Sequence, residues 1–258
     1  MIASDLDRTL IYSEAAMRLG EPVADPVCVE VYEGRPISFV SPLALAGLAE
    51  LSRRVDVVPT TTRTVAQYER VSLPGVRTPF AITTNGGRLL VDGVACPDWD
   101  RAVADELADS AAYEEAVLAL AGAFDRPWVL KVRDAERLFL YTVFDRALAD
   151  PDWFGELDSV AGGLGWTVSV QGRKAYVVPA ALTKQAALAE VVRRTGATRV
   201  VAAGDSLLDQ GFLEAADVAI RPAHGELHDA GWCPPGLIVT RRAGGGAAEE
   251  IVDLFAQA

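Results

Sequence analysis

The sequence has 258 residues, of which 50% are hydrophobic and 23% are charged, the composition of a globular protein that can bury a sizeable core. Its 36 acidic and 24 basic residues give a formal net charge of -12, which excludes nucleic-acid binding through the general field of the protein. Cys28, Cys96 and Cys233 are widely separated without a Cys-x-x-Cys pair, so we expect free thiols rather than disulfides or a zinc site.

The first residues, Met-Ile-Ala-Ser-Asp, lack the basic and apolar regions of a signal peptide. No uncharged apolar stretch reaches the roughly 18 residues that a membrane helix needs. We therefore expect a cytoplasmic protein with no nucleic-acid and no membrane partner. The sequence does not indicate an oligomeric state.

Short apolar runs alternate with amphipathic stretches along most of the chain. The apolar runs predict buried strands at Val55–Pro59, Phe80–Thr84, Arg199–Ala203, Val218–Ile220 and Leu237–Val239. The amphipathic stretches predict helices at Pro42–Arg54, Val65–Ser72, Lys184–Thr195, Leu207–Ala215 and Ala247–Phe255. This alternation predicts an α/β fold with a Rossmann-like, mostly parallel sheet that carries helices on both faces.

Two parts of the chain depart from that alternation. A hairpin is indicated by two strand-like runs, Val27–Tyr32 and Pro36–Val40, on either side of Glu-Gly-Arg. We expect this hairpin to be an enlarged flap over the active site. Residues 87–180 predict an inserted α/β cap, with a hairpin turn at Asp-Gly, a helical stretch around Ala102–Phe124 and further strands and helices. The predicted domains are thus a core formed by residues 1–86 and 181–258, and a cap formed by residues 87–180.

Two aspartates follow the first short apolar run, in the sequence Ile-Ala-Ser-Asp-Leu-Asp-Arg-Thr-Leu at positions 2–10. On an extended chain, the carboxylates of Asp5 and Asp7 point to the same side. Two like charges at the carboxyl end of a first parallel strand repel each other unless a cation neutralises them, and open α/β sheets bind ligands at this end. Mg²⁺ together with phosphate is the natural pairing, although Asp-x-Asp alone is equally compatible with two solvated loop acids.

Three further segments carry polar residues at the ends of predicted elements. The first is a buried strand followed by Thr-Thr-Thr-Arg at positions 60–63, whose hydroxyls and amides suit phosphate oxygens but also suit helix capping. The second is Lys184, which opens a helix where the dipole disfavours a cation unless an anion is bound nearby; a solvated surface lysine is the simpler alternative. The third, Gly-Asp-Ser-Leu-Leu-Asp at positions 204–209, allows Asp205 and Asp209 to share one face and reach one cation.

In this order, the four segments resemble the four motifs of the haloacid dehalogenase-like (HAD) hydrolases: Asp-x-Asp-x-Thr, a strand-end threonine, a lysine and Gly-Asp-x-x-x-Asp. The resemblance covers nearly the whole chain. It extends to the branch with an α/β cap inserted between the second and third motifs, which includes Cof-type, sucrose-phosphate and mannosyl-3-phosphoglycerate phosphatases. Thr-Asn-Gly at positions 84–86 stands where this branch has its Asn-Gly, and Lys184 stands where it has its lysine.

The resemblance implies a Mg²⁺-dependent phosphatase that acts through an aspartyl-phosphate intermediate on a small phosphorylated metabolite, such as a sugar phosphate. Asp5 would be the nucleophile, and Asp7 would be the general acid and base. Thr61 and Lys184 would bind the phosphoryl group. The implied metal ligands are Asp5, the backbone carbonyl of Asp7, Asp205 and Asp209, the last as a ligand or as an outer partner.

Two residues depart from the family pattern: Arg8 stands where glycine is commonest, and Thr62 replaces the glycine of Thr-Gly-Arg. We interpret Arg8 as a tolerated surface residue rather than a substrate contact, and the register of the motif among the threonines at positions 60–62 stays open. Candidate substrate-binding residues are Arg63, Asn85, Arg173 and Lys174, although outward-facing charges on a cap sheet are the simpler explanation of the last two.

Two other functions fit the same sequence. A phosphotransferase or phosphomutase of this fold would pass the phosphoryl group to a sugar hydroxyl instead of water. A catalytically silent binding or regulatory protein would keep only the fold. The presence of all five residues of the implied site, Asp5, Asp7, Thr61, Lys184 and Asp205, argues against a silent protein, which has no physical need for the whole set.

Overall fold

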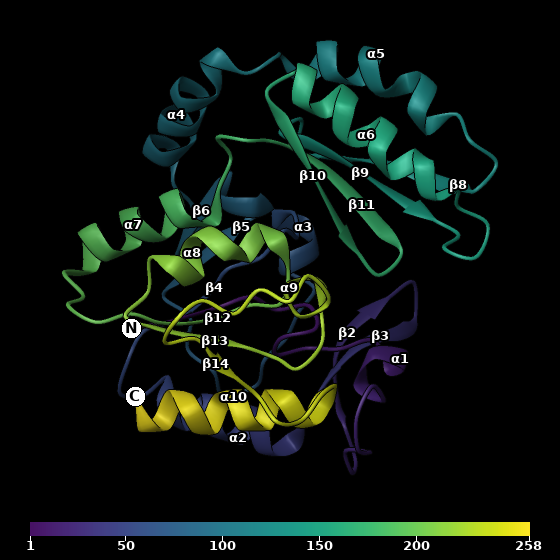
Figure 1. Ribbon diagram of the computed structural model, residues 1–258. Coiled ribbons are helices and arrows are strands. Elements are labelled where there is room, and N and C mark those ends of the chain that lie inside the picture. The colour runs from purple at the N-terminus through teal and green to yellow at the C-terminus, as the bar shows by residue number, and fades with distance from the viewer. The chain divides into compact units, whose positions relative to one another are not determined.

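The computed structural model describes residues 1–258, and the chain forms two compact units. Unit 1 contains residues 1–96 and 184–258, and unit 2 contains residues 97–183. Because unit 2 is a continuous segment between two parts of unit 1, it is an insertion in the chain (Figure 1).

Unit 1 is built on a five-stranded sheet in which all neighbouring strands are parallel. In sheet order, its strands are β14 (Ile238–Val239), β13 (Val218–Arg221), β12 (Val201–Ala203), β1 (Ile2–Ser4) and β4 (Val57–Pro59). The first strand of the chain therefore lies between β12 and β4 and is buried along its whole length. Residues that follow β1, β4 and β12 leave the sheet at the same edge, and this brings their side chains together.

Helices cover both faces of this sheet, with α7 and α8 on one face and α2 and α10 on the other (Figure 1). The helices of unit 1 are α1 (Glu14–Met17), α2 (Pro42–Leu51), α3 (Val65–Tyr68), α7 (Lys184–Thr195), α8 (Gln210–Glu214), α9 (Glu226–Asp229) and α10 (Gly245–Gln257). Two short 3₁₀ helices, η1 (Thr84–Gly86) and η3 (Leu207–Asp209), follow β5 and β12. Leu48 of α2 and Ile251 of α10 belong to one core cluster with Ile2 of β1.

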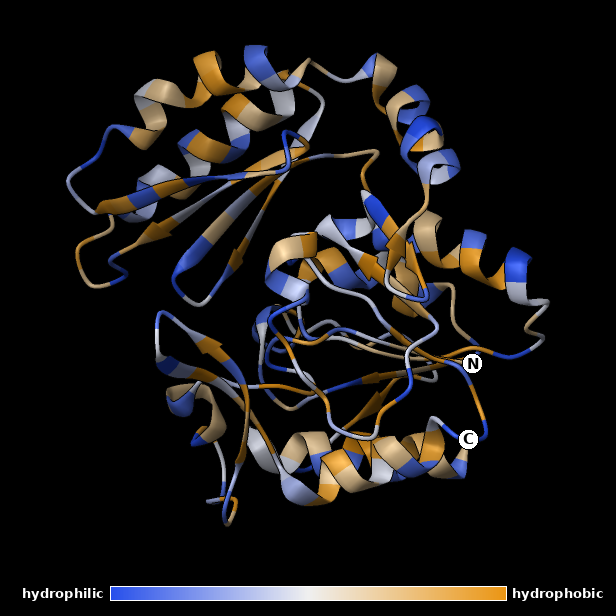
Figure 2. Cartoon of the chain, turned by 180° about the vertical axis from the view of Figure 1, so that it is seen from behind, coloured by the Kyte–Doolittle hydropathy of each residue, from blue (hydrophilic) through white to orange (hydrophobic).

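The packing of α2 against α10 follows from the hydrophobic patterns of the two helices. α10 carries polar residues on one side and apolar residues on the side that meets the core, whereas α2 is apolar apart from Glu50 (Figure 2). Gly47 allows a close approach, because a Cβ atom at this position would lie 2.5 Å from Cγ1 of Val252 on α10. The two helices thus close one face of the sheet.

Two antiparallel sheets complete unit 1. The hairpin of β2 (Val27–Tyr32) and β3 (Arg35–Val40) turns at Glu33 and Gly34, both with positive φ, and Tyr12 bridges to Phe39. The other sheet contains β5 (Phe80–Thr83), β6 (Arg88–Val91) and β7 (Val94–Ala95), and a parallel bridge between Thr60 and Ile82 joins it to the end of β4.

Unit 2 is an antiparallel sheet with helices against one face. The strands in sheet order are β10 (Trp166–Gln171), β11 (Lys174–Pro179), β9 (Phe139–Phe144) and β8 (Val129–Ala135). The helices are α4 (Pro97–Glu106), η2 (Leu107–Asp109), α5 (Tyr113–Phe124) and α6 (Pro151–Gly163). Trp153 of α6 packs edge-on against Phe144, and its indole N–H donates to the carbonyl of Ala123, so this large side chain is buried without an unpaired polar atom.

The predicted α/β class, parallel core sheet and inserted α/β unit are confirmed. The helical stretch around Ala102–Phe124 is in fact two helices, α4 and α5, because Ser110 leaves the helix in an extended conformation. The predicted helix Val65–Ser72 is only one turn, α3. The predicted helix Ala247–Phe255 begins two residues earlier, because Gly245 and Gly246 lie inside α10 and only Gly244 of the three glycines adopts a positive φ.

The predicted domain boundaries follow residues 86 and 180, whereas the compact units divide after Cys96 and Thr183. The difference at the first boundary is the hairpin of β6 and β7. β6 pairs with β5 from Phe80 to Thr83, and this pairing makes the hairpin part of unit 1.

All three cysteines are free, as expected. None of the helices combines the length and the apolarity required to cross a membrane.

Replacing Leu48 with alanine should destabilise unit 1 by about 2–5 kcal/mol, because Leu48 is fully buried between the sheet and α10 and would leave a cavity. Leu43 lies on the same helix but is 70% exposed, so Leu43→Ala should change the free energy of unfolding by less than about 0.5 kcal/mol. Chemical denaturation of both variants checks this, and equal losses would show that α2 does not pack as described.

Candidate active site

Asp5 and Asp7 leave the sheet directly after β1. The amide of Asp5 donates to the carbonyl of Ala203 at 2.8 Å, which fixes the chain at the last paired position between β1 and β12. Leu6 is fully buried in the core cluster below the sheet, and Asp5 is 5% exposed. The side chain of Asp7 is 35% exposed. The two aspartates therefore meet different environments, one dry and one open to solvent.

The loop after β12 brings a second pair of acids to the same place. Asp205 and Asp209 are buried, and their carboxylate oxygens and those of Asp5 lie within 4.8 Å of one another. Oδ2 of Asp209 accepts from the amides of Asp205 and Ser206 and from the Ser206 hydroxyl. A Cβ atom at Gly204 would lie 2.6 Å from Cβ of Asp209, so the glycine of this motif allows the loop to fold back.

Lys184 is the first residue of α7 and is 1% exposed. Its Nζ donates to Oδ1 of Asp5 at 2.7 Å and to Oδ1 of Asp209 at 2.5 Å. Burial alone would lower the pKa of Lys184, but Asp209 and Asp5 outweigh it and hold the pKa above its ordinary value. The lysine therefore stays charged. The two carboxylates are the anions that offset the unfavourable helix dipole.

Asp5, Asp205 and Asp209 form an acidic cluster. This cluster contains more negative charge than its neighbours neutralise. Burial raises the pKa of Asp5 to about 7; Lys184 opposes this effect, and Asp209 and Asp7 add to it. Burial also raises the pKa of Asp205 well above its ordinary value, with further contributions from Asp5 and Asp209. A buried carboxylate whose charged form is disfavoured in this way is stabilised when a cation binds to it.

Arg8, which we interpreted as a tolerated surface residue, has a side chain that is 31% exposed and that also reaches the acidic residues of the site. Its φ of 65° is in the left-handed region, which explains why glycine suits this position, and its Nε lies 3.3 Å from Oδ2 of Asp205. The carbonyl of Arg8 accepts from Nε2 of His224, whose Nδ1 accepts the amide of Gly244 at 3.2 Å. Burial lowers the pKa of His224 to about 4, so this neutral histidine fixes the loop after Asp7.

The loop after β4 supplies the threonines and Arg63. The Thr60 hydroxyl donates back to the carbonyl of Val58, whereas the Thr61 hydroxyl accepts the amide of Arg63 at 3.2 Å. Thr62 is 7% exposed. Asn85, in the left-handed region with φ 56°, donates its amide to the carbonyl of Thr61, so the predicted Asn-Gly segment supports this loop.

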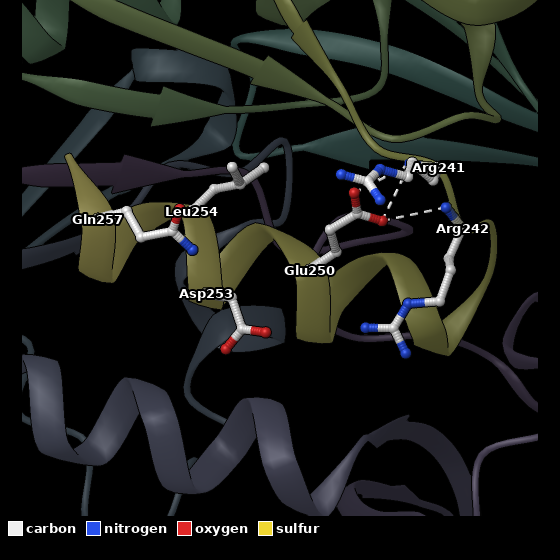
Figure 3. A pocket seen from close by; sticks show the side chains of 6 residues that line it. All are labelled: Arg241, Arg242, Glu250, Asp253, Leu254 and Gln257. Carbon is white, nitrogen blue, oxygen red and sulfur yellow. Dashed lines mark hydrogen bonds between the residues drawn. The ribbon is translucent and has the colours of Figure 1, made fainter.

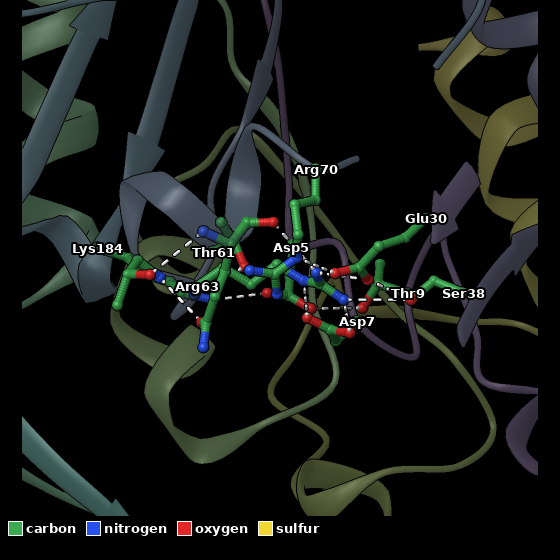
Figure 4. A network of polar contacts seen from close by, with 11 residues as sticks. Asp5, Asp7, Thr9, Glu30, Ser38, Thr61, Arg63, Arg70 and Lys184 are labelled. Carbon is green, nitrogen blue, oxygen red and sulfur yellow. Dashed lines mark hydrogen bonds and ion pairs between the residues drawn. The ribbon is translucent and has the colours of Figure 1, made fainter. Parts of the chain in front are cut away.

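Arg63 holds Asp7 through two hydrogen bonds, from Nε to Oδ2 at 2.6 Å and from Nη2 to Oδ1 at 2.8 Å. Figure 4 shows that this guanidinium lies within a larger network that includes Glu30, Ser38 and Arg70. Burial alone would lower the pKa of Arg63, but Asp7 and Glu30 raise it above its ordinary value. The guanidinium meets protein groups on all sides, whereas the sequence suggested a substrate contact.

Glu30 and Ser38 were not among the predicted site residues, because both lie in the predicted flap and outside the four motifs. In the strand pattern Val-Cys-Val-Glu-Val-Tyr, Glu30 alternates with the valines and would face solvent. The structure has register shifts on both sides of Glu30, and this bulge buries Val29 and Glu30 together. A local bulge has no sequence marker here.

Arg173 and Lys174 belong to unit 2. Lys174 is the first residue of β11, and its Nζ lies 5.7 Å from the ring centroid of Tyr141 and 6.0 Å from that of Tyr176. The carbonyl of Arg173 accepts the amide of Phe144, which joins the end of β9 to the residue before β11. The Lys174 ammonium therefore lies near two tyrosine rings on one face of the sheet.

A surface hollow lies along α10 and the loop before it (Figure 3). Its lining residues are Arg241, Arg242, Glu250, Asp253, Leu254 and Gln257. The Glu250 carboxylate accepts the backbone amides of Arg241 and Arg242, so its charge stabilises the loop. No residue of the acidic cluster lines this hollow. The two arginines and two acids that line it balance in charge.

No family model and no curated protein matches the sequence. Solved structures do match over the full length. The sucrose-phosphatase from Synechocystis sp., in complex with sucrose and phosphate, is 16% identical, with a TM-score of 0.67 over 99% of this chain and 97% of that chain. A HAD subclass IIB sugar phosphatase is 13% identical, with a TM-score of 0.62 over 100% of this chain and 99% of that chain.

The C-terminal domain of trehalose-6-phosphate phosphatase from C. albicans is 13% identical, with a TM-score of 0.61 over 99% of this chain and 91% of that chain. The chain therefore has the fold of the HAD phosphatases with an inserted α/β cap, and the fold resemblance expected from the four motifs is confirmed.

Gly225→Ala should distort the acidic cluster, because Gly225 has φ of 96° and a Cβ atom there would lie 2.5 Å from Oδ2 of Asp205. Gly231 is the matched control: its φ is 66°, and a Cβ atom there would have no neighbour within 4 Å. Gly231→Ala carries a left-handed strain of about 1–2 kcal/mol. Gly225→Ala should lose about 1–3 kcal/mol more, because the ψ of Gly225 is 176°, a region essentially restricted to glycine, and because the added Cβ meets Asp205. Unfolding free energies of the two variants check this, and equal losses would contradict the close contact.

Proposed function

We propose that this protein is a Mg²⁺-dependent phosphatase that forms a phosphoryl-aspartate intermediate on Asp5 and acts on a small phosphorylated metabolite. The observation that carries the proposal is the position of the Asp5 carboxylate. It lies at the carboxyl end of a central parallel strand, between Lys184 and two further buried acids, with Asp7 two residues away. The fold shared with sugar phosphatases supports it.

In the first step, an oxygen of Asp5 attacks the phosphorus atom, and the bond from phosphorus to the substrate oxygen breaks. Asp7 gives a proton to that leaving oxygen. In the second step, Asp7 takes a proton from water as the water oxygen attacks phosphorus. The bond from phosphorus to Asp5 breaks, and phosphate leaves. The exposed fraction of the Asp7 side chain, 35%, suits a group that must meet both a substrate oxygen and water.

Lys184 and Thr61 are the proposed phosphoryl ligands. The Lys184 ammonium already contacts Asp5 and has a third donor for a phosphate oxygen. The Thr61 hydroxyl accepts the amide of Arg63, which leaves its own proton for an acceptor. The Thr60 hydroxyl is turned toward the carbonyl of Val58, and this favours position 61 for the motif threonine.

The residues of the cluster fit a magnesium ion. Mg²⁺ prefers oxygen ligands, and three buried carboxylates whose oxygens lie within 4.8 Å supply them together with a surplus of negative charge. When bound, Mg²⁺ would offset the charge that gathers on phosphate and carboxylate. Asp5, Asp205 and the carbonyl of Asp7 are the proposed direct ligands. Asp209 already accepts four hydrogen bonds, one at Oδ1 and three at Oδ2, so it fits best as an outer partner that holds Lys184 and the loop.

Unit 2 is the proposed source of substrate selection. Lys174 and the aromatic rings of Tyr141 and Tyr176 combine a cation with apolar faces, which suits a polyhydroxylated or anionic group such as a sugar phosphate. Arg173 precedes Lys174 in the same hairpin and is a second candidate for an anionic group.

Asp5→Asn should lower the Mg²⁺-dependent release of phosphate from 4-nitrophenyl phosphate to less than about one thousandth, because the near-isosteric amide is not a nucleophile. Asp253→Asn is the matched control, since Asp253 is exposed on α10. Phosphate release measured for both variants tests the proposal. Activity that survives in Asp5→Asn would overturn the proposed mechanism.

Mg²⁺ should stabilise the wild-type protein, by about 2.7 kcal/mol when its concentration is a hundred times the dissociation constant. Asp205→Asn should weaken this effect, because it removes one carboxylate charge from the cluster. Calorimetric titration with MgCl₂ and thermal unfolding with and without the ion measure it independently of activity. Equal Mg²⁺ affinity in both proteins would exclude Asp205 as a ligand.

A further inference from the structure

Glu30 is a buried carboxylate that the proposed mechanism does not use. It lies in β2 of the hairpin, and its side chain has no exposed surface. Oε2 accepts from the Ser38 hydroxyl at 2.7 Å and from Nη1 of Arg63 at 2.8 Å, and Oε1 accepts from Nε of Arg70 at 3.1 Å. A fully buried acid that holds two arginines must have a large effect on where those arginines lie.

The donors of Arg63 are all engaged by protein groups. Nε and Nη2 hold the two oxygens of Asp7, Nη1 holds Glu30, and the remaining contacts reach Ser38 and the carbonyl of Gln67. The side chain is 11% exposed. This network contains two cations, Arg63 and Arg70, and two carboxylates, Asp7 and Glu30, so its charges balance. The guanidinium plane, and with it the orientation of Asp7, is therefore fixed from the hairpin side.

Glu30 reaches this place because the hairpin is irregular there. The register between β2 and β3 shifts on both sides of Glu30, and the resulting bulge turns its side chain toward Arg63. Arg70 further ties the hairpin to α3, since its guanidinium lies 4.8 Å from the ring centroid of Tyr32. The hairpin thus has a defined position relative to the loop that carries Arg63.

We propose that Glu30 is a positioning residue for Asp7, the proposed general acid and base. Glu30 acts on Asp7 through Arg63. The inference rests on the proposed function. Arg63 holds both oxygens of Asp7, so the direction of the Asp7 carboxylate follows that of the guanidinium. Glu30 fixes this guanidinium. Arg63 itself has no donor left for substrate.

A purely structural role for Glu30 would affect all substrates alike, whereas a role through Asp7 depends on the leaving group. The leaving group of 4-nitrophenyl phosphate departs as a stable anion and needs no proton. The phenolate of phenyl phosphate is more basic and depends on proton donation. Because kcat/KM reports the steps up to leaving-group departure, the two substrates separate these roles.

The test is Glu30→Gln, which keeps the shape and removes the charge. It should lower kcat/KM for phenyl phosphate by about tenfold to a hundredfold and that for 4-nitrophenyl phosphate by less than about twofold. Glu30→Asp, which keeps the carboxylate, should recover part of the loss. Glu33→Gln is the matched control, since Glu33 is exposed at the turn of the same hairpin.

A second set of variants tests the route through Arg63. Arg63→Lys removes the two-point contact with Asp7, so adding Glu30→Gln to it should cause no further loss for phenyl phosphate. Additive losses, equal losses for both substrates, or unchanged kinetics in Glu30→Gln would each overturn the inference. Asp5→Asn in the same assays keeps the two proposals apart: if it is inactive, such a result overturns only the role of Glu30, and if it is active, the proposed function fails as well.

Discussion

The contact of Lys184 with Asp5 and Asp209 is the constraint on which the rest of the site depends. It joins residues 179 positions apart and brings together the two parts of the chain that flank the insertion. Three buried carboxylates without a cation would not stay charged, and breaking a buried ion pair by removing one partner is strongly destabilising. The lysine thus allows acids to gather inside the protein, and the remaining negative charge creates the demand for a further cation.

A second ion network holds the other aspartate. Asp5 lies in the dry cluster with Lys184, and Asp7 lies two residues later against Arg63, with Glu30 behind it. Asp5 and Asp7 therefore have different environments, although only one residue lies between them in the chain. The proposed nucleophile, Asp5, benefits from a fixed position next to a cation, and the proposed general acid and base, Asp7, needs contact with water. The chain obtains both from neighbouring residues because Leu6 between them is anchored in the core.

The loops after β1 and β12 illustrate how backbone conformation limits the site. Arg8 takes a left-handed conformation that glycine adopts at lower cost, and Gly225 takes one where a methyl group would strike Asp205. The arginine at position 8 adds a cation beside Asp205 that glycine could not provide. A departure from the family pattern therefore has a local consequence, namely a partial counter-charge at the edge of the cluster.

Much of this protein could be predicted from its sequence, because strand periodicity and the order of the motifs are local properties. Buried runs such as Val218–Ile220 predicted the strands, and Lys184–Thr195 was predicted with the bounds of α7. The resemblance of the four motifs to those of the HAD hydrolases also implied that Asp5, Asp205, Asp209 and Lys184 would meet.

Tertiary structure alone decided the partners of these residues. Arg63 could be expected near phosphate, but its bond to Asp7 depends on a loop 56 residues away and on the bulge that buries Glu30. The assignment of β6 and β7 to unit 1 likewise depends on pairing with β5. The sequence determined which elements form and where the acids gather, since these follow from local pattern and sheet topology. Only the folded chain decided which charge neutralises which, because that depends on side-chain distances.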